Sequence, residues 1–232
     1  MDMTSLKAVI FDKDGTLFDF STTWEAWAAA FLRRIATSDV QADALGRRVG
    51  FDIHRQKFLQ GSIAIAGTPM EVAQALAPLL PDLTTDALVA ILNEEAASAP
   101  QAEVLPLPPF LDRLRGMALK LGVVTNDAET PARAHLAAAN VADSFDFIAG
   151  FDSGFGAKPA PGQLLACARA MDIAPEHIVM VGDSTHDLIA AQRAGMRGVG
   201  VLTGLADYET LAPYADDVLP DISALPGWIS SH

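Results

Sequence analysis

The amino-acid sequence predicts an α/β protein in which a parallel sheet carries an inserted, all-helical block. A short apolar run, Ala8 to Phe11, is typical of a buried parallel strand and stops at two carboxylates, Asp12 and Asp14. Strands and helices alternate beyond residue 103, which predicts crossover helices between parallel strands. Residues from about 19 to 100 have helical patterns only, so this block interrupts the sheet directly after its first strand.

Composition excludes several classes of protein. The chain has 232 residues, enough for one large domain or two small ones, and half of its residues are hydrophobic, so a disordered chain is excluded. The formal charge of −13 argues against nucleic acid or an anionic membrane as a partner, although a bound metal ion would still allow an anionic substrate. Cys167 is the single cysteine and lies in an apolar helical stretch, so we expect it to pack in the core.

No membrane or export signal is recognisable. Met1 to Lys7 contains no apolar signal core, and no apolar run reaches membrane-spanning length. We therefore expect a cytoplasmic protein, either a monomer or a homodimer.

The helical block is predicted from its start signals. Thr22 and Glu25 are spaced as a capping box, and Thr68 to Glu71 combine a cap, a proline at the first helical position and a glutamate that closes the box. Two further helices are expected around Val40–Val49 and Thr85–Ala97. Prolines 100, 106, 108 and 109 mark the end of the block. The expected division is therefore core at 1–18, helical block at 19–102, and core again at 103–232.

The second part of the chain supplies the remaining sheet. The expected strands are Leu119–Val124, Phe145–Ala149, Ile178–Val181 and Gly198–Leu202. The expected helices are Phe110–Met117, Pro131–Ala139, Gly162–Met171 and Thr185–Ala194, the last of which ends at Gly195 as a helix cap. The first strand must join this same sheet, because it has no other partner.

Polar residues follow several of these strands. The carboxyl ends of parallel strands lie at one edge of a sheet, where α/β proteins bind ligands. The side chains expected to converge there are those of Asp12, Asp14, Thr125, Lys158, Asp183 and Asp187. A cluster of carboxylates suits Mg²⁺, and a lysine with a threonine hydroxyl suits a phosphoryl group. An aspartate beside both can attack phosphorus, while a second acid exchanges protons with the leaving group and water.

These motifs, in this order, resemble those of the haloacid dehalogenase (HAD) superfamily, in particular its phosphoglycolate phosphatase-like branch with a helical C1 cap. They are Asp12-Lys13-Asp14-Gly15-Thr16, Thr125-Asn126, Lys158-Pro159 and Gly182-Asp183-Ser184-Thr185-His186-Asp187. The resemblance covers the whole chain. It implies a Rossmann-like parallel sheet of strand order 5-4-1-2-3, with the strand that carries the nucleophile at its centre.

The resemblance also implies a role for each matched residue. Asp12 would be the nucleophile that forms an aspartyl-phosphate, and Asp14 the general acid and base. The phosphoryl group would be held by Thr125, Asn126 and Lys158. Mg²⁺ would be bound by the carboxylates of Asp12 and Asp183, by the backbone carbonyl of Asp14, and by Asp187 directly or through water.

Three alternatives stay open at this point. A dehalogenase of the same fold lacks the second acid, so Asp14 speaks against it. A β-phosphoglucomutase-like phosphohexose mutase shares both acids, and Thr16 weakly favours a phosphatase. A phospho-receiver or binding module also combines aspartates, threonine, lysine and Mg²⁺, but such a module is about half as long and has no cap.

Lys13 departs from the resemblance, because relatives usually carry an apolar or aromatic residue there. We expect it to form a solvated ion pair. Trp24 and Trp27 are expected in the core of the block, His186 is expected to face outward, and His135 shows no metal-ligand spacing.

The substrate is expected to be a small phosphorylated metabolite, with phosphoglycolate the leading candidate from the resemblance. Four cations of the block are possible partners for a substrate carboxylate, or else simple surface charges. They are Arg47, Arg48, Arg55 and Lys57.

Overall fold

A computed structural model describes residues 6–59 and 61–231 of the chain. The expectation about the amino terminus, Met1 to Lys7, therefore falls mostly outside the described residues. Within them, six strands form one parallel sheet in the order β5-β4-β1-β6-β7-β8. The strands are β1 (Ala8–Phe11), β4 (Lys120–Val124), β5 (Phe147–Ala149), β6 (Ile178–Gly182), β7 (Arg197–Val201) and β8 (Asp217–Leu219).

The strand order confirms the prediction. β1 lies between β4 and β6, with Phe11 paired to Val123 on one side and to Val181 on the other. Read from β7 to β5, the five expected strands stand in the order 5-4-1-2-3. The sixth strand, β8, was not predicted, and it extends the sheet beyond β7.

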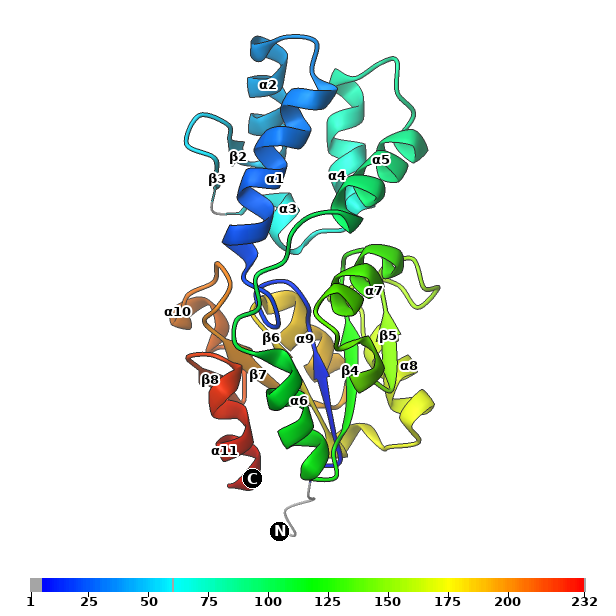
Figure 1. Cartoon of the computed structure of the whole chain (residues 1–232), viewed down its shortest axis with the longest axis vertical. Coiled ribbons are helices and arrows are strands. Elements are labelled where there is room, and N and C mark those ends of the chain that lie inside the picture. The colour runs from blue at the N-terminus through cyan, green and yellow to red at the C-terminus, as the bar shows by residue number, and fades with distance from the viewer. Residues whose placement is uncertain (1–5, 60, 232) are drawn as a thin grey trace.

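Both faces of the sheet are covered by helices (Figure 1). Successive side chains of a strand point to opposite faces, so Val9 and Phe11 belong to one apolar cluster, and Ala8 and Ile10 to another. The first cluster is completed by α6 (Leu107–Gly116), α7 (Glu129–Ala138) and α11 (Leu225–Ser230). The second is completed by α8 (Gly162–Met171) and α9 (Thr185–Ala194). Cys167 lies fully buried in the second cluster, as predicted.

The helical block, residues 19–102, stands beyond one edge of this sheet (Figure 1). Its helices are α1 (Phe20–Ile35), α2 (Asp39–Val49), α3 (Ile63–Ala66), α4 (Pro69–Leu76) and α5 (Thr85–Ala97). They enclose an apolar cluster of their own, which includes Phe31, Leu45, Leu76 and Leu88. The block is mainly helical, as predicted, and it also contains a short antiparallel hairpin between β2 (Phe51–Asp52) and β3 (Lys57–Phe58).

Several element ends differ from the expected ones. α1 begins at Phe20, because Asp19 caps it by accepting a hydrogen bond of 2.7 Å from the Thr22 amide, so the capping box expected at Thr22 is wrong. The box at Thr68 and Glu71 is present. The shorter elements are α10 (Tyr208–Leu211) and the 3₁₀ turns Ala77–Leu79, Ala142–Ser144, Pro175–His177 and Ile222–Ala224. Among the described residues there is no helix whose length and hydropathy would let it cross a membrane.

The chain enters and leaves the helical block at one point. Phe18 and Glu103 form an antiparallel backbone bridge. The Asp19 amide donates to the Ala102 carbonyl at 2.8 Å, and the Val104 amide donates to the Leu17 carbonyl at 3.0 Å. These bonds lie at the predicted boundaries of residues 18/19 and 102/103, although the division into domains itself stays a prediction.

Candidate active site

The side chain that follows β1 is the centre of the candidate site. Asp12 keeps the sheet register, since its amide donates to the Val181 carbonyl at 2.9 Å. Its Oδ1 lies 2.7 Å from Nζ of Lys158, which also donates to the Val124 carbonyl at 3.0 Å. Gly15 follows with φ of +81°, so the chain turns away from the strand as expected for glycine. The loop after β5 thus brings Lys158 to the strand end that carries Asp12.

Two more carboxylates join Asp12. Oxygen atoms of Asp12, Asp183 and Asp187 all lie within 4.8 Å of one another, and all three residues are buried. Asp183 directly follows β6, and Asp187 lies in the first turn of α9, where its Oδ2 accepts from the Ser184 amide and hydroxyl. Oδ1 of Asp187 is 2.6 Å from Nζ of Lys158. The Lys158 ammonium therefore forms ion pairs with two of the three clustered carboxylates, those of Asp12 and Asp187.

This imbalance of charge affects the proton affinities of the cluster. Burial raises the pKa of Asp12 to about 7 against the opposing effect of Lys158, and Asp187 adds to the rise. Burial, together with the negative charges of Asp12 and Asp187, also raises the pKa of Asp183. Burial works against the Lys158 ammonium, yet the neighbouring carboxylates raise its pKa above the ordinary lysine value. The cluster lacks positive charge for its number of carboxylates.

The cluster is suited to a hard divalent cation. Carboxylate oxygens are the ligands that Mg²⁺ prefers, and a divalent charge would balance the acids that Lys158 leaves uncompensated. The backbone keeps the space around Asp183 narrow, because a Cβ atom at Gly15 or Gly204 would overlap its carboxylate. The residues present thus fit Mg²⁺ through Asp12, Asp183 and Asp187.

The Asp14 carboxylate lies outside this cluster and faces the helical block. Its Oδ1 accepts from Lys13 Nζ at 2.8 Å and from Trp24 Nε1 at 2.9 Å. Trp24 was expected in the core of the block, and this expectation is wrong, because α1 directs its indole to the acid. Among the matched residues, the structure therefore separates Asp14 from the three clustered acids.

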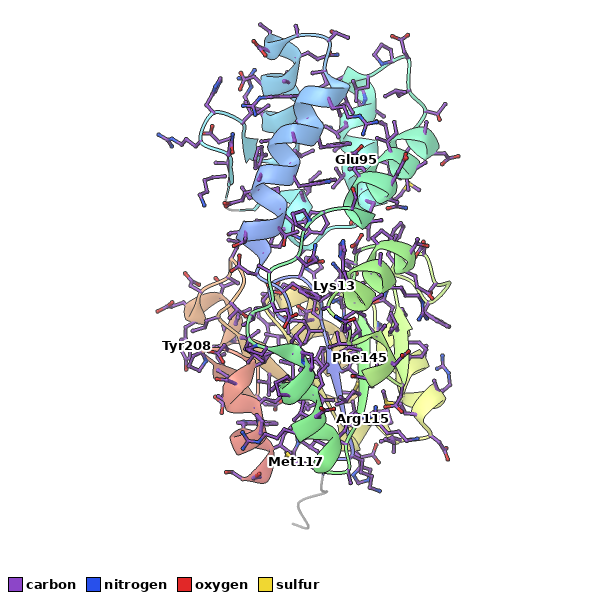
Figure 2. All side chains as sticks on the ribbon, viewed as in Figure 1. Lys13, Glu95, Arg115, Met117, Phe145 and Tyr208 are labelled. Carbon is purple, nitrogen blue, oxygen red and sulfur yellow. The ribbon has the colours of Figure 1, made fainter. Side chains whose placement is uncertain are left out.

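Lys13 is fully buried, so the expected solvated ion pair is also wrong. Figure 2 shows this residue where the helical block meets the sheet domain. Its Nζ lies 2.7 Å from Oδ2 of Asp14, 3.4 Å from Oδ2 of Asp127 and 3.0 Å from Nδ1 of His135. Burial opposes the ammonium, and the two carboxylates raise the pKa of Lys13 in spite of it. The ion pair is therefore an interior one at the junction of sheet and block.

Thr125 and Asn126 follow β4 and have different surroundings. Oγ1 of Thr125 accepts from the Asp127 amide at 3.0 Å, and its proton stays available for a ligand. The Asn126 side chain is already engaged: it donates to the carbonyls of Ala66 and Lys158 and accepts from the Lys158 amide. Asn126 thus fixes the Lys158 loop and touches the end of α3.

A cleft between the sheet edge and the helical block contains these groups. Its volume is about 120 Å³. The sheet side contributes Asp12, Asp14, Thr125, Lys158 and Asp183, and His186 lines the cleft as well, so the expectation that His186 faces away is wrong. Trp27 also lines the cleft while stacking on Phe31, and so serves the core of the block as well.

The four cations of the block do not line this cleft. Arg47 pairs with Asp43, the Arg48 guanidinium donates to the Ala75 carbonyl, Arg55 pairs with Asp52, and Lys57 pairs with Glu25. All four side chains are occupied near the surface, which matches the alternative reading of them as surface charges.

Two features of the site were missed in the sequence. The first is the loop after β7, where the Thr203 hydroxyl donates to the Gly15 carbonyl at 2.6 Å and Gly204 approaches Asp183. A polar residue and a glycine after a fifth strand end were the available signal. The second is His135, which had no local signal, because its partner Lys13 is distant in sequence and its own neighbours form an ordinary helix.

Comparison with known proteins agrees with this arrangement. Residues 6–195 match the model of the haloacid dehalogenase-like hydrolases. The chain is 31% identical to a phosphoglycolate phosphatase of Neisseria meningitidis, over 95% of this chain and 91% of the relative. It is 30% identical to a protein of Dickeya dadantii named "Probable phosphatase IndB", over 92% and 88%.

Solved structures share the fold at lower identity. A β-phosphoglucomutase from Clostridium difficile superimposes with a TM-score of 0.64 at 20% identity, over 97% of this chain and 98% of that one. At that identity the likeness speaks for the fold alone. The match to the family model, which spans most of the chain, shows that this protein belongs to the haloacid dehalogenase-like hydrolase family.

Proposed function

We propose that this hydrolase is a Mg²⁺-dependent phosphatase, which cleaves a small phosphate monoester through an aspartyl-phosphate on Asp12. The observation that carries the proposal is the position of Asp12. Asp12 directly follows β1 at the centre of the sheet. Its carboxylate contacts the Lys158 ammonium at 2.7 Å and belongs to the buried cluster of three acids. Relatives that match over most of the chain and are named phosphatases support the same reaction.

The metal would be held by the carboxylates of Asp12, Asp183 and Asp187. When bound, Mg²⁺ supplies positive charge for the phosphoryl oxygens and for the acids that hold it. Lys158 adds a further positive charge, and the hydroxyl proton of Thr125 is free to bind a phosphoryl oxygen. Asn126 takes a supporting part, because its amide holds the Lys158 loop rather than the ligand.

Two acids divide the chemistry. An oxygen of Asp12 attacks phosphorus and the bond from phosphorus to the leaving alcohol breaks, while Asp14, which must enter this step as the protonated acid, gives its proton to that alcohol. Asp14, now a carboxylate, then takes a proton from a water molecule that attacks the aspartyl-phosphate. This second step releases inorganic phosphate and restores the carboxylate of Asp12. The contacts of Asp14 with Lys13 and Trp24 hold its carboxyl group at the cleft.

The candidate substrate is phosphoglycolate, whose leaving alcohol carries a carboxylate. Phosphoglycolate stays a prediction, supported by the names of relatives such as the Neisseria protein. The cations of the block that were candidates for its carboxylate lie elsewhere, so the cleft itself adds no support for it.

The experiment measures phosphate release from a panel of monoesters with Mg²⁺, with excess chelator, and with the Asp12→Asn variant. We expect turnover with Mg²⁺, reversible loss with chelator, and a fall of about 10⁴-fold or more for Asp12→Asn. Circular dichroism checks that the variant is folded. Near-normal hydrolysis by folded Asp12→Asn protein would exclude Asp12 as the nucleophile. Isomerisation of a hexose 1-phosphate to its 6-phosphate without phosphate release would identify a mutase instead.

A further inference from the structure

The wall that the helical block contributes to the cleft is almost wholly apolar. The side chains that form most of it are those of Phe20, Trp24, Trp27, Phe58, Ile65 and Val72. The sheet edge, in contrast, contributes the acids, Thr125 and Lys158. The phosphoryl group and the leaving group therefore meet two different environments, and the wall of the block is the surface that contacts the leaving group.

No cation of the block is available to an anionic leaving group in this cleft. Among the described residues that line it, Lys158 is the single lysine or arginine, and Asp12 and Asp187 already occupy its ammonium. Asp14 and Asp127 add negative charge to the same cleft. A carboxylate on the leaving group would lose its hydration there without gaining a free lysine or arginine, and the polar side chains left to meet it are His186 and the unpartnered indole Nε1–H of Trp27.

The start of α4 also offers no anion site. Its positive end borders the cleft at Gly67 and Thr68. The carboxylate of Glu71 occupies it, because Oε2 accepts from the Thr68 amide at 2.7 Å and from the Thr68 hydroxyl at 3.0 Å. Pro69, the first residue of the helix, has no N–H to donate. A second carboxylate would meet repulsion from Glu71.

The apolar wall is well suited to a ring. The rings of Trp24 and Trp27 meet edge to face, with centroids 5.1 Å apart, and those of Phe20 and Phe58 do the same at 5.3 Å. Such rings favour a flat partner that can stack or meet them edge to face. A sugar has several hydroxyl groups, and the side chains of this wall offer them one unpartnered donor, the Nε1–H of Trp27, so most of the hydroxyls would stay unpaired.

From these contacts we infer that the substrate is a phosphate monoester whose leaving group is uncharged, apolar and ring-bearing. The inference rests on the proposed phosphatase function and specifies its substrate class. The rings and aliphatic side chains of the block bind the body of the alcohol, and the sheet edge binds the phosphoryl group. A leaving group with a carboxylate is discriminated against, because the described residues of the cleft include no lysine or arginine besides Lys158, which already pairs with two acids.

A matched pair of substrates tests this on the wild-type protein with Mg²⁺. Benzyl phosphate and 4-carboxybenzyl phosphate share the same scissile bond and differ in one remote carboxylate. We expect kcat/KM to be about 10- to 100-fold higher for benzyl phosphate, the effect of one unpaired buried polar group. Phosphoglycolate is the third substrate, and we expect it to be hydrolysed less efficiently than benzyl phosphate. Equal or higher kcat/KM for either carboxylate substrate would overturn the inference.

A pair of variants tests the cause. Ile65 lines the cleft, whereas Ile63, on the same short helix, is 37% exposed and lines only a second groove, which lies between α3 and the loop at residues 205–207. Ile65→Arg places a cation in the wall and is expected to narrow or reverse the preference between the two benzyl substrates. Ile63→Arg is the matched control and is expected to keep the wild-type ratio. The same ratio in all three proteins would contradict the inference.

The two proposals fail in different ways. Absence of Asp12-dependent phosphate release from every monoester would overturn the phosphatase function. Asp12-dependent release that is faster for phosphoglycolate than for benzyl phosphate would keep the phosphatase and reject the apolar leaving group. The ratio of kcat/KM for two substrates is measured within one protein, so it does not depend on the amount of active protein. The test on the wild-type protein therefore stands even if Ile65→Arg protein folds poorly.

Discussion

Nζ of Lys13 lies 3.0 Å from Nδ1 of His135, in the buried junction between the sheet and the helical block. Nε2 of His135 lies 2.7 Å from the carbonyl oxygen of Ala96, the next-to-last residue of α5. Because a carbonyl only accepts, the ring proton is assigned to Nε2, and Nδ1 is the acceptor for Lys13. Burial, helped by the charge of Lys13, lowers the pKa of His135 to about 4, so the ring is neutral at pH 7. The pair connects Asp14 to α7 and, through it, to α5.

Replacing Lys13 by methionine removes a fully buried ammonium and leaves the carboxylates of Asp14 and Asp127, which are only 14% and 9% exposed, without their partner. We expect the free energy of unfolding to fall by about 3–5 kcal/mol, the effect of breaking a buried ion pair on one side. Urea denaturation measures it. Lys57→Met is the matched control, because Lys57 pairs with Glu25 but is 61% exposed, and its loss is expected to be below about 1 kcal/mol. Equal losses of unfolding free energy in the two variants would contradict an interior ion pair at Lys13.

The histidine predicts a pH dependence of stability. An unfolded histidine binds a proton near pH 6.5, whereas His135 in the folded protein does so only near pH 4. The unfolded state therefore binds more protons between these values, and stability is lost as the pH falls from about 6.5 to 4, by about 3 kcal/mol in total. Below pH 4 this contribution stays constant.

His135→Gln isolates that contribution, since its amide can accept from Lys13 and donate to Ala96 but does not titrate. Urea denaturation of both proteins at pH 7.5 and 4.5 is the measurement. The wild type is expected to lose more stability than the variant over this interval. Identical losses would mean that His135 does not remain neutral in the folded state.

The proton-transfer role of Asp14 predicts a dependence on the leaving group. Asp14→Asn is expected to slow the first step about 10²- to 10⁴-fold for an alkyl phosphate, which needs a proton on its departing oxygen. An activated aryl phosphate such as 4-nitrophenyl phosphate departs without one and is expected to lose much less. Single-turnover kinetics separate this step from the hydrolysis of the aspartyl-phosphate. Equal losses of the single-turnover rate for both substrates would argue against Asp14 as the general acid.

The close approach of Gly204 to Asp183 predicts an effect on metal binding. In Gly204→Ala the new Cβ would overlap the carboxylate of Asp183, which must then move. We expect Mg²⁺ to bind about tenfold or more weakly. Calorimetric titration with Mg²⁺ measures this without any substrate. Gly227→Ala is the control, because a Cβ at that position meets no atom within 4 Å. Unchanged Mg²⁺ affinity in Gly204→Ala would argue against Asp183 as a ligand.

The sheet was predictable because its signals are local. β1 and β6 are apolar runs that stop at polar or glycine residues, and such a pattern needs no knowledge of distant partners. β8 escaped prediction because it has three residues, all of them half-buried or exposed. The hairpin of β2 and β3, with two residues in each strand, is shorter than any periodic pattern.

The candidate site was predictable to the extent that strand ends determine it. Asp12, Thr125 and Asp183 converge because parallel strands carry them to one edge, and the loop after β5 adds Lys158. The contacts of the block follow from packing between segments far apart in the chain, so the sequence near Arg47 or Trp24 did not show which side chain would face the cleft. The position of Lys13 in the interior depends on His135, 122 residues away, and no local pattern contains that relationship.

The backbone bridge between Phe18 and Glu103 has an evolutionary consequence. The helical block leaves the sheet and returns to it at adjacent points, so its two ends impose no displacement on β1 or α6. A lineage could exchange or redesign this contiguous segment while the hydrogen-bond register of the sheet, and with it the reacting groups, stays inherited unchanged. Mutations in the helical block can then change which alcohol is selected, while the residues of the sheet that react with phosphorus stay the same.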